Sequence, residues 1–254
     1  MNKPIVIIGL GEMGGIFARG FLRTGHPIYP ITREMDIGTE ANNIPPPKLV
    51  LVAVAEGDLA AVLKQIPPAW ADRLCLLQNE LLPQDWTNFD NPTVISVWFE
   101  KKKGVDSKVI IPSPVFGPQE GLVAEALNVI GIPARLLNDA EELLFELVVK
   151  NLYILTSNIA GLKVGGTVGE LWENHREFAT QVANEVIDIQ EALTQKKFDH
   201  ERLIQAMVTA FEGDPAHKCM GRSAPARLQR ALEHEFRFHL KLPTLQDIAS
   251  HRPG

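Results

Sequence analysis

The chain is poor in cysteine and carries no excess of basic residues. Only Cys75 and Cys219 are cysteines among its 254 residues, so a disulfide framework is excluded and a reducing cytoplasm is the simplest setting. Lysine and arginine together number 25 against 31 acidic residues, which gives a net charge of −6. Because these charges do not indicate a basic face, nucleic acid is not an expected partner.

Recognisable export and membrane signals are also lacking. The first residues have the pattern of a strand rather than of a signal peptide, and no uninterrupted apolar run reaches the ~20 residues that cross a bilayer. We therefore expect a cytoplasmic protein without a membrane partner. The composition, 45% hydrophobic and 22% charged, is that of a globular protein with one large or two modest domains.

What the sequence does contain is a glycine-rich turn between a buried strand and a helix. The apolar run over residues 5–8 is followed by the pattern G-x-G-x-x-G. In this pattern Gly9 permits the tight turn, Gly11 lets the backbone approach a pyrophosphate, and Gly14 lets the helix pack close to the strand. The helix N-terminus then faces the phosphate charge, although a merely structural turn is the alternative. The predicted cofactor-binding residues here are Gly9, Leu10, Gly11, Glu12, Met13 and Gly14.

Strands and helices alternate in the first part of the chain, and only helices follow. We expect strands over residues 27–32, 49–54 and 74–77 and near 93–99, 109–111 and 133–137. We expect helices over 12–24, 58–65 and 120–129, with 34–47 as a loop and Lys101-Lys102-Lys103 in a solvated hairpin or loop. After residue 138 the pattern predicts helices over 139–162, 170–195, 199–212 and 225–239.

This order predicts the class of fold. Alternating strands and helices indicate an α/β dinucleotide-binding domain of Rossmann type over residues 1–138. The helical pattern that follows predicts an all-helical domain over residues 139–254, with the active site in the cleft between the two.

The end of the second predicted strand bears on the choice of dinucleotide. An acidic residue there binds the ribose 2′-hydroxyl of NAD, whereas an arginine accommodates the 2′-phosphate of NADP. The chain has Thr32-Arg33 at this point. A guanidinium pairs with phosphate in bidentate fashion, so we predict NADP(H), with a solvated loop arginine as the alternative.

The helical part begins with two polar residues that are candidates for a ligand site. Lys150 stands among apolar residues, and burial of a lysine costs desolvation energy unless it has a partner or a task. Asn158 lies eight residues later, a rise of about 12 Å in a helix, so the two side chains do not touch but share a broad face. They can bracket a small ligand; a surface lysine and a polar helix face are the alternative.

The chain resembles the ketopantoate reductase (2-dehydropantoate 2-reductase) family over nearly its whole length. The matching stretches, in order, are the glycine-rich turn, Gly25-His26…Thr32-Arg33, residues 49–54, Gln78-Asn79, Lys150…Asn158, Gly169-Glu170-Leu171 and Arg222-Ser223-Ala224…Glu235. The resemblance implies a Rossmann domain followed by a helical domain like the C-terminal domain of 6-phosphogluconate dehydrogenase.

The resemblance also implies a reaction. NADPH would reduce a 2-oxo acid, 2-dehydropantoate in pantothenate synthesis, and the protein would align substrate and cofactor. Lys150 would be the general acid that protonates the developing alkoxide, with Glu235 as a second catalytic residue. Asn79, Asn158 and Ser223 would bind substrate, and Asn79 would also lie near the nicotinamide. A homodimer is left open.

Several of these positions have a structural alternative. Ser223 can cap the helix that follows it, Asn79 can belong to a turn, and Glu233 can replace Glu235 as the acidic residue. Zinc is rejected, because His217-Lys218-Cys219 is spaced too closely and has no matched second pair.

Three departures from the family pattern bear on the substrate. Glu80 replaces a glycine, Ala55 a lysine and Ile154 an asparagine. A more apolar pocket favours a different 2-oxo acid, and loss of activity would leave a non-catalytic NADP-binding regulatory protein. Both alternatives remain open at this point.

Overall fold

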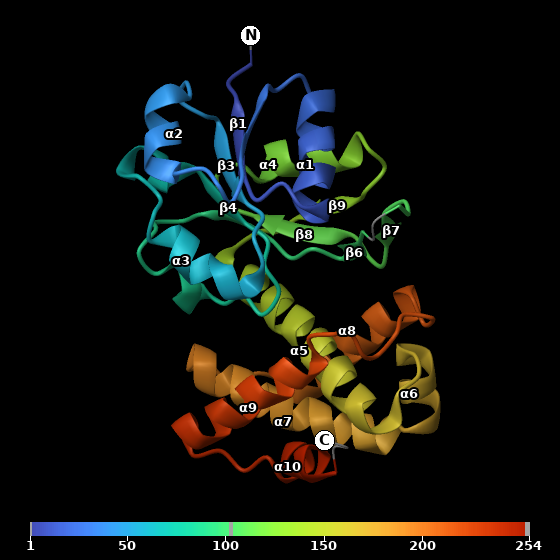
Figure 1. The fold of residues 1–254 in the computed structure, drawn as a ribbon. Coiled ribbons are helices and arrows are strands. Elements are labelled where there is room, and N and C mark those ends of the chain that lie inside the picture. The colour runs from blue at the N-terminus through green and yellow to red at the C-terminus, as the bar shows by residue number, and fades with distance from the viewer. Residues whose placement is uncertain (1, 102–103, 252–254) are drawn as a thin grey trace. The chain divides into compact units, whose positions relative to one another are not determined.

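The computed structural model describes residues 2–101 and 104–251, so Lys102 and Lys103 of the lysine run lie outside the described residues. The chain forms two compact units, Met1–Leu147 and Val148–Gly254. Each unit is described by itself below (Figure 1).

The first unit is built on a seven-stranded sheet. Its strands are β1 (Ile5–Ile8), β2 (Ile28–Ile31), β3 (Leu49–Val52), β4 (Leu74–Leu76), β5 (Thr93–Ile95), β8 (Ser113–Phe116) and β9 (Ala134–Leu136). They lie in the order β2-β1-β3-β4-β5-β8-β9. The first five are parallel, with Ile5 opposite both Ile28 and Leu49, and β8 runs antiparallel to β5. Chain connections change direction between β1 and β3, which makes this a topological switch point.

Both faces of the four central strands β1, β3, β4 and β5 are buried, as continuous apolar strands predict. Successive side chains alternate, so Ile5 and Ile7 face α1 (Glu12–Arg23) and α4 (Glu120–Asn128), while Val6 and Ile8 face the opposite core. Figure 1 shows α1 and α4 together beside the sheet. The opposite core receives side chains from α2 (Ile37–Asn43), from α3 (Leu59–Leu63) and from the start of α5 (Ala140–Val164). The predicted fold class, a mostly parallel sheet followed by helices, is confirmed.

Several local expectations in this unit are wrong. Strand β8 was not expected, and the strand expected near 109–111 reaches only to Val109, in a separate two-stranded sheet. Residues 34–47 contain helix α2 rather than only loop, because Asp36 accepts a hydrogen bond from the Thr39 amide and Ile37 is buried. The helix expected over 58–65 is shorter, with a 3₁₀ turn at Glu56–Asp58 before α3. The remaining short elements are β6 (Phe99–Glu100), β7 (Lys108–Val109) and the 3₁₀ turns Pro68–Arg73 and Pro83–Trp86.

The second unit is helical. It holds most of α5, then α6 (Val168–Asn174), α7 (Arg176–Thr194), α8 (His200–Gly213), α9 (Ala224–Phe238) and α10 (Pro243–Ser250). The single helix expected over 170–195 is two helices, since a separate turn begins at Thr167, whose side chain and that of Glu170 form a capping box. Helix α10 was not expected. The buried carboxylate of Glu185 accepts hydrogen bonds from the Thr244 and Leu245 amides at its start.

Helix α5 is the one element, among the residues that the structure describes, with the length and composition of a membrane span. Lys150 and Lys163 interrupt its apolar residues, so the helix does not appear in the sequence as one continuous apolar run. The most apolar window has a mean hydropathy of 1.3, and 78% of that window is buried inside the protein. Such burial is typical of the core helix of a soluble protein.

Candidate active site

The glycine-rich turn of the first unit is held tightly between β1 and β3. Gly9 has φ +93°, and a methyl group there would lie 2.8 Å from the Ala53 carbonyl oxygen. A methyl group on Gly14 would lie 2.2 Å from the Gly9 carbonyl oxygen, so α1 packs against the turn itself. Gly11 is the N-cap of α1 and has nothing within 4 Å of its methyl position. The turn therefore meets the steric requirements of the G-x-G-x-x-G pattern.

The other predicted residues of the turn surround the start of α1. Leu10 is exposed, and Met13 packs against the core. Glu12 occupies the first turn of the helix, where its charge is favourable for the helix dipole but opposes a phosphate. The ammonium of Lys101 lies 3.9 Å from the Glu12 carboxylate and offsets that charge.

Arg33 follows β2 and points into solvent. Its side chain is 91% exposed and lies 3.9 Å from the carboxylate of Asp58, which is itself exposed. An exposed pair of this kind contributes little stability, so a phosphate competes readily for the guanidinium. This position, at the carboxyl end of the strand beside β1, is the one that reads the adenosine ribose in such sheets.

In the segment Gln78-Asn79-Glu80 after β4, the first side chain links two strands and the second is exposed. The buried Gln78 side chain donates to the Val52 carbonyl oxygen at 2.7 Å and accepts from the Leu77 amide, so it joins the ends of β3 and β4. Asn79 is exposed beside it. Glu80 has φ +60°, a left-handed conformation that favours glycine. Ala55 precedes the 3₁₀ turn after β3.

Lys150 lies half-buried on α5 in the second unit. The neighbouring residues Val149 and Asn151 are buried, and the Lys150 ammonium stands 5.6 Å from the centre of the Tyr153 ring. Burial, aided by the positive charge of Arg227, lowers the pKa of Lys150 to about 7. A lysine in this state gives up its proton near neutral pH, as a general acid must.

Asn158 is buried two turns further along α5 and is hydrogen-bonded within the unit. Its Nδ2 donates to the Cys219 carbonyl oxygen at 3.0 Å and, at 3.4 Å, to the Ser157 hydroxyl. Its Oδ1 accepts a 2.8 Å hydrogen bond from the guanidinium of Arg227. Ile154, also buried, stands between Lys150 and Asn158 on the helix.

Arg227 is a residue that sequence reasoning missed. It is 9% exposed and lies on α9 beside the buried residues Ala224, Leu228 and Ala231. The helical spacing of the sequence could have identified it, because Arg227 is the one charged residue among the apolar positions that form the buried face of α9. The structure thus brings together Lys150, Asn158 and Arg227.

Ser223 and Glu235 lie elsewhere on α9. Ser223 is the exposed N-cap, but its side chain makes no capping hydrogen bond. Glu235 Oε1 accepts from the Leu242 amide at 3.0 Å and from Gln246 at 2.8 Å, which ties it to the start of α10. Its alternative, Glu233, accepts from Gln229 one turn earlier.

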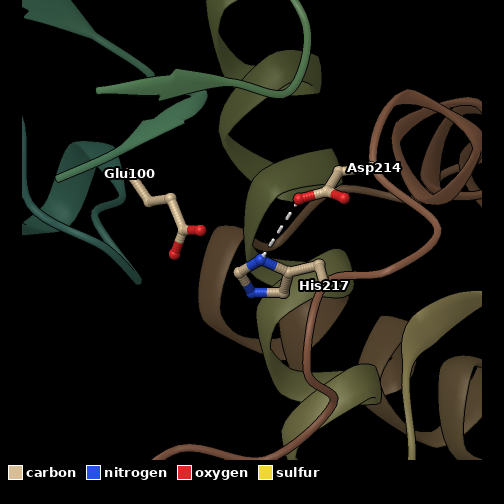
Figure 2. Close-up of side chains that lie close together, drawn as sticks. All are labelled: Glu100, Asp214 and His217. Atoms are coloured by element: carbon tan, nitrogen blue, oxygen red, sulfur yellow. Dashed lines mark ion pairs between the residues drawn. The ribbon is translucent and has the colours of Figure 1, made fainter. Parts of the chain in front are cut away.

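The loop between α8 and α9 contains the residues considered for zinc. Figure 2 shows Asp214 and His217 directed toward one another, and His217 Nδ1 lies 3.9 Å from the buried Asp214 carboxylate. Cys219 is buried against α5, and burial raises the pKa of its thiol to about 11. A methyl group on Gly161 would lie 2.8 Å from the Cys219 Cβ, so this loop packs closely on α5.

Comparisons with known proteins place the fold. No protein-family model matches the chain, and no curated protein matches its sequence significantly. The 2-dehydropantoate 2-reductase from Methylococcus capsulatus is 12% identical with a TM-score of 0.73, covering 97% of this chain and 94% of that one. D-mandelate dehydrogenase, in a complex with NADH, is 14% identical with a TM-score of 0.68, covering 97% and 96%.

A dimeric ketopantoate reductase from Staphylococcus aureus is 17% identical with a TM-score of 0.63, covering 97% of this chain and 96% of that chain. The chain therefore has the fold of the ketopantoate reductase structures. At these identities the likeness concerns the fold alone.

Proposed function

We propose that the protein is a nicotinamide-dependent oxidoreductase that reduces a 2-oxo acid, with NADPH as hydride donor. The observation that carries this proposal is the grouping of Lys150 on α5 with the buried, hydrogen-bonded pair Asn158 and Arg227; burial and the Arg227 charge also lower the pKa of Lys150 to about 7. A phosphate-binding turn in the first unit and the shared fold of reductases support it. The proposed substrate is 2-dehydropantoate, and the proposed setting is pantothenate synthesis in the cytoplasm.

The chemistry assigns one task to each group. The cofactor, when bound, supplies a hydride to the ketone carbon, and the two electrons of the carbonyl π bond move onto its oxygen. Lys150 stabilises this oxygen with its positive charge and then gives it a proton, which yields the 2-hydroxy acid. Asn79 and Ser223 remain candidates for contacts to the substrate, and Glu235 remains a candidate for orienting Lys150.

The glycine-rich turn and Arg33 account for the proposed cofactor. Gly11 leaves open space at the α1 N-terminus, where backbone amides favour the pyrophosphate. The exposed guanidinium of Arg33 suits the extra phosphate of NADPH. A homodimer is the proposed assembly, because a related fold is described as dimeric.

The test is NADPH oxidation with 2-dehydropantoate and a panel of other 2-oxo acids. Lys150→Ala should lower kcat by about 100- to 10,000-fold, because that is the usual contribution of a general acid, and should leave NADPH binding unchanged. Lys163→Ala is the matched control on the same helix, where the lysine pairs with Asp247 at the surface. An unaltered kcat in Lys150→Ala would remove this residue from the mechanism.

A second candidate keeps the cofactor and changes the substrate. The buried Ile154 beside Lys150 offers an apolar contact where the family has an amide, and one protein of the same fold is D-mandelate dehydrogenase. A larger apolar 2-oxo acid would then have a higher kcat/KM than 2-dehydropantoate. Tight NADPH binding with no turnover on any 2-oxo acid would instead favour a regulatory protein.

A further inference from the structure

We infer that Arg227 binds the carboxylate of the 2-oxo acid, a role that rests on the proposed function. The inference begins with Asn158, which the sequence marked as a substrate-binding residue. An amide group has two N–H donors and one acceptor oxygen. In the structure the amide nitrogen of Asn158 donates to the Cys219 carbonyl and to the Ser157 hydroxyl. Its oxygen accepts from the Arg227 guanidinium.

An ionised 2-oxo acid presents only acceptors to the protein. Its carboxylate and its ketone both need donors, and the Asn158 amide already directs its nitrogen to other groups. Asn158 is therefore better described as a positioning residue that holds the guanidinium in place. A buried arginine stays protonated, so Arg227 carries a positive charge that suits an anionic ligand.

The guanidinium of Arg227 has the right chemistry for this ligand. It carries five N–H donors in a planar fork, and the bond to Asn158 uses one of them. Forked donors match the two oxygens of a carboxylate, which is why arginine rather than lysine is common at such sites. The low exposure of Arg227 keeps the pairing away from competing water.

The relation between Arg227 and Lys150 gives this contact a catalytic consequence. Two cations near one another on the same unit repel, and that repulsion contributes to the lowered pKa of Lys150. A carboxylate bound at Arg227 offsets the repulsion, so Lys150 is protonated more readily when substrate is present. Substrate binding therefore favours the protonated form of Lys150, which is the form that the reaction needs.

The experiment compares a 2-oxo acid with its neutral methyl ester. The wild-type protein should favour the acid, and Arg227→Gln should raise KM for the acid by about 100-fold while leaving that of the ester nearly unchanged. Arg227→Lys, which keeps the charge but lacks the fork, should show a smaller selective loss. Arg237→Gln makes the same change at an exposed position of α9 and should behave as wild type.

Three results would overturn the inference. They are equal losses for acid and ester in both Arg227 variants, no loss in either, or no preference for the acid in the wild-type protein. A merely structural role would lower activity on both compounds together. It would also leave the pH profile of kcat/KM unchanged, whereas loss of the Arg227 charge beside Lys150 should move the pH at which kcat/KM falls to a higher value.

Binding of oxamate separates this inference from the proposed reaction, because oxamate carries the carboxylate but is not reduced. Calorimetry in the presence of NADP⁺ should show oxamate bound by the wild-type protein and bound about 100-fold less tightly by Arg227→Gln, with neutral oxamide unaffected. This result without turnover on any 2-oxo acid would refute the proposed reductase but keep Arg227 as a carboxylate site. Absence of oxamate binding to the wild-type protein would overturn the inference.

Discussion

Gly14 touches the turn that it helps to form, since a methyl group on it would lie 2.2 Å from the carbonyl oxygen of Gly9. Gly14→Ala must therefore displace either the turn or helix α1. We expect a fall of about 1–3 kcal/mol in the free energy of unfolding and loss of NADPH binding. Thermal unfolding and fluorescence titration measure the two effects. Gly15→Ala is the control, because nothing lies within 4 Å of its methyl position; similar behaviour of the two variants would contradict the close packing.

Gly11 separates cofactor binding from stability. A methyl group there meets nothing within 4 Å in the protein alone, so Gly11→Ala should unfold at the same temperature as wild type. If a pyrophosphate approaches the backbone at this point, the same methyl group should weaken NADPH binding by about 10-fold or more. Unchanged affinity in calorimetry would mean that the cofactor does not pass Gly11.

Arg33 should decide the choice between NADPH and NADH. Its exposed guanidinium has only a weak pairing with Asp58, so Arg33→Ala should leave stability unchanged. Loss of a charged contact to the 2′-phosphate should raise KM for NADPH by about 10- to 100-fold without raising that for NADH. Arg23→Ala, at an exposed position of α1, controls for general electrostatic attraction. Equal effects on both cofactors would exclude recognition of the 2′-phosphate.

The pH dependence of kcat/KM should report Lys150. Its pKa is lowered from 10.5 to about 7, so the protonated acid predominates only below that value. We expect kcat/KM, which reports the enzyme without bound substrate, to fall by about tenfold for each pH unit above it. Stability should depend on pH in a related way, because the pKa of Lys150 is lower in the folded protein than in the unfolded chain. The contribution of Lys150 to the free energy of unfolding is therefore present at high pH and is lost as pH falls from about 10.5 to about 7. A kcat/KM that stays level up to pH 9 would contradict this assignment.

Glu80 carries a conformational cost that a glycine would relieve. Its φ of +60° lies in the left-handed region, where a side chain costs about 1–2 kcal/mol, partly offset by the greater unfolded-state entropy of glycine. Glu80→Gly should therefore raise the free energy of unfolding by about 0.5–1 kcal/mol in denaturant titration. Asn79→Gly is the neighbouring control and should lower it, since Asn79 has no positive φ. A loss of stability in Glu80→Gly would show that the side chain contributes more than its conformation costs.

Sequence reasoning worked best where local rules decide the structure. The glycine-rich turn was predicted with its flanking strand and helix, because the positive φ of Gly9 and the close approach at Gly14 are requirements on neighbouring residues. The mostly parallel sheet followed from apolar runs that alternate with helical periods. Helix α2 was missed because its signal, Asp36 capping the Thr39 amide, is a single contact in a polar segment.

The sequence by itself determined the glycine-rich turn, the parallel sheet and the position of Lys150 on a long apolar helix, since strand and helix periods and glycine conformations act over a few residues. Only the tertiary structure decided that Arg227 holds Asn158, 69 residues away, and that Glu185 holds the start of α10, 59 residues away from it. Such pairs depend on how helices pack. Hydrophobic packing is nondirectional, so the pattern of one helix does not say which distant polar group it will meet.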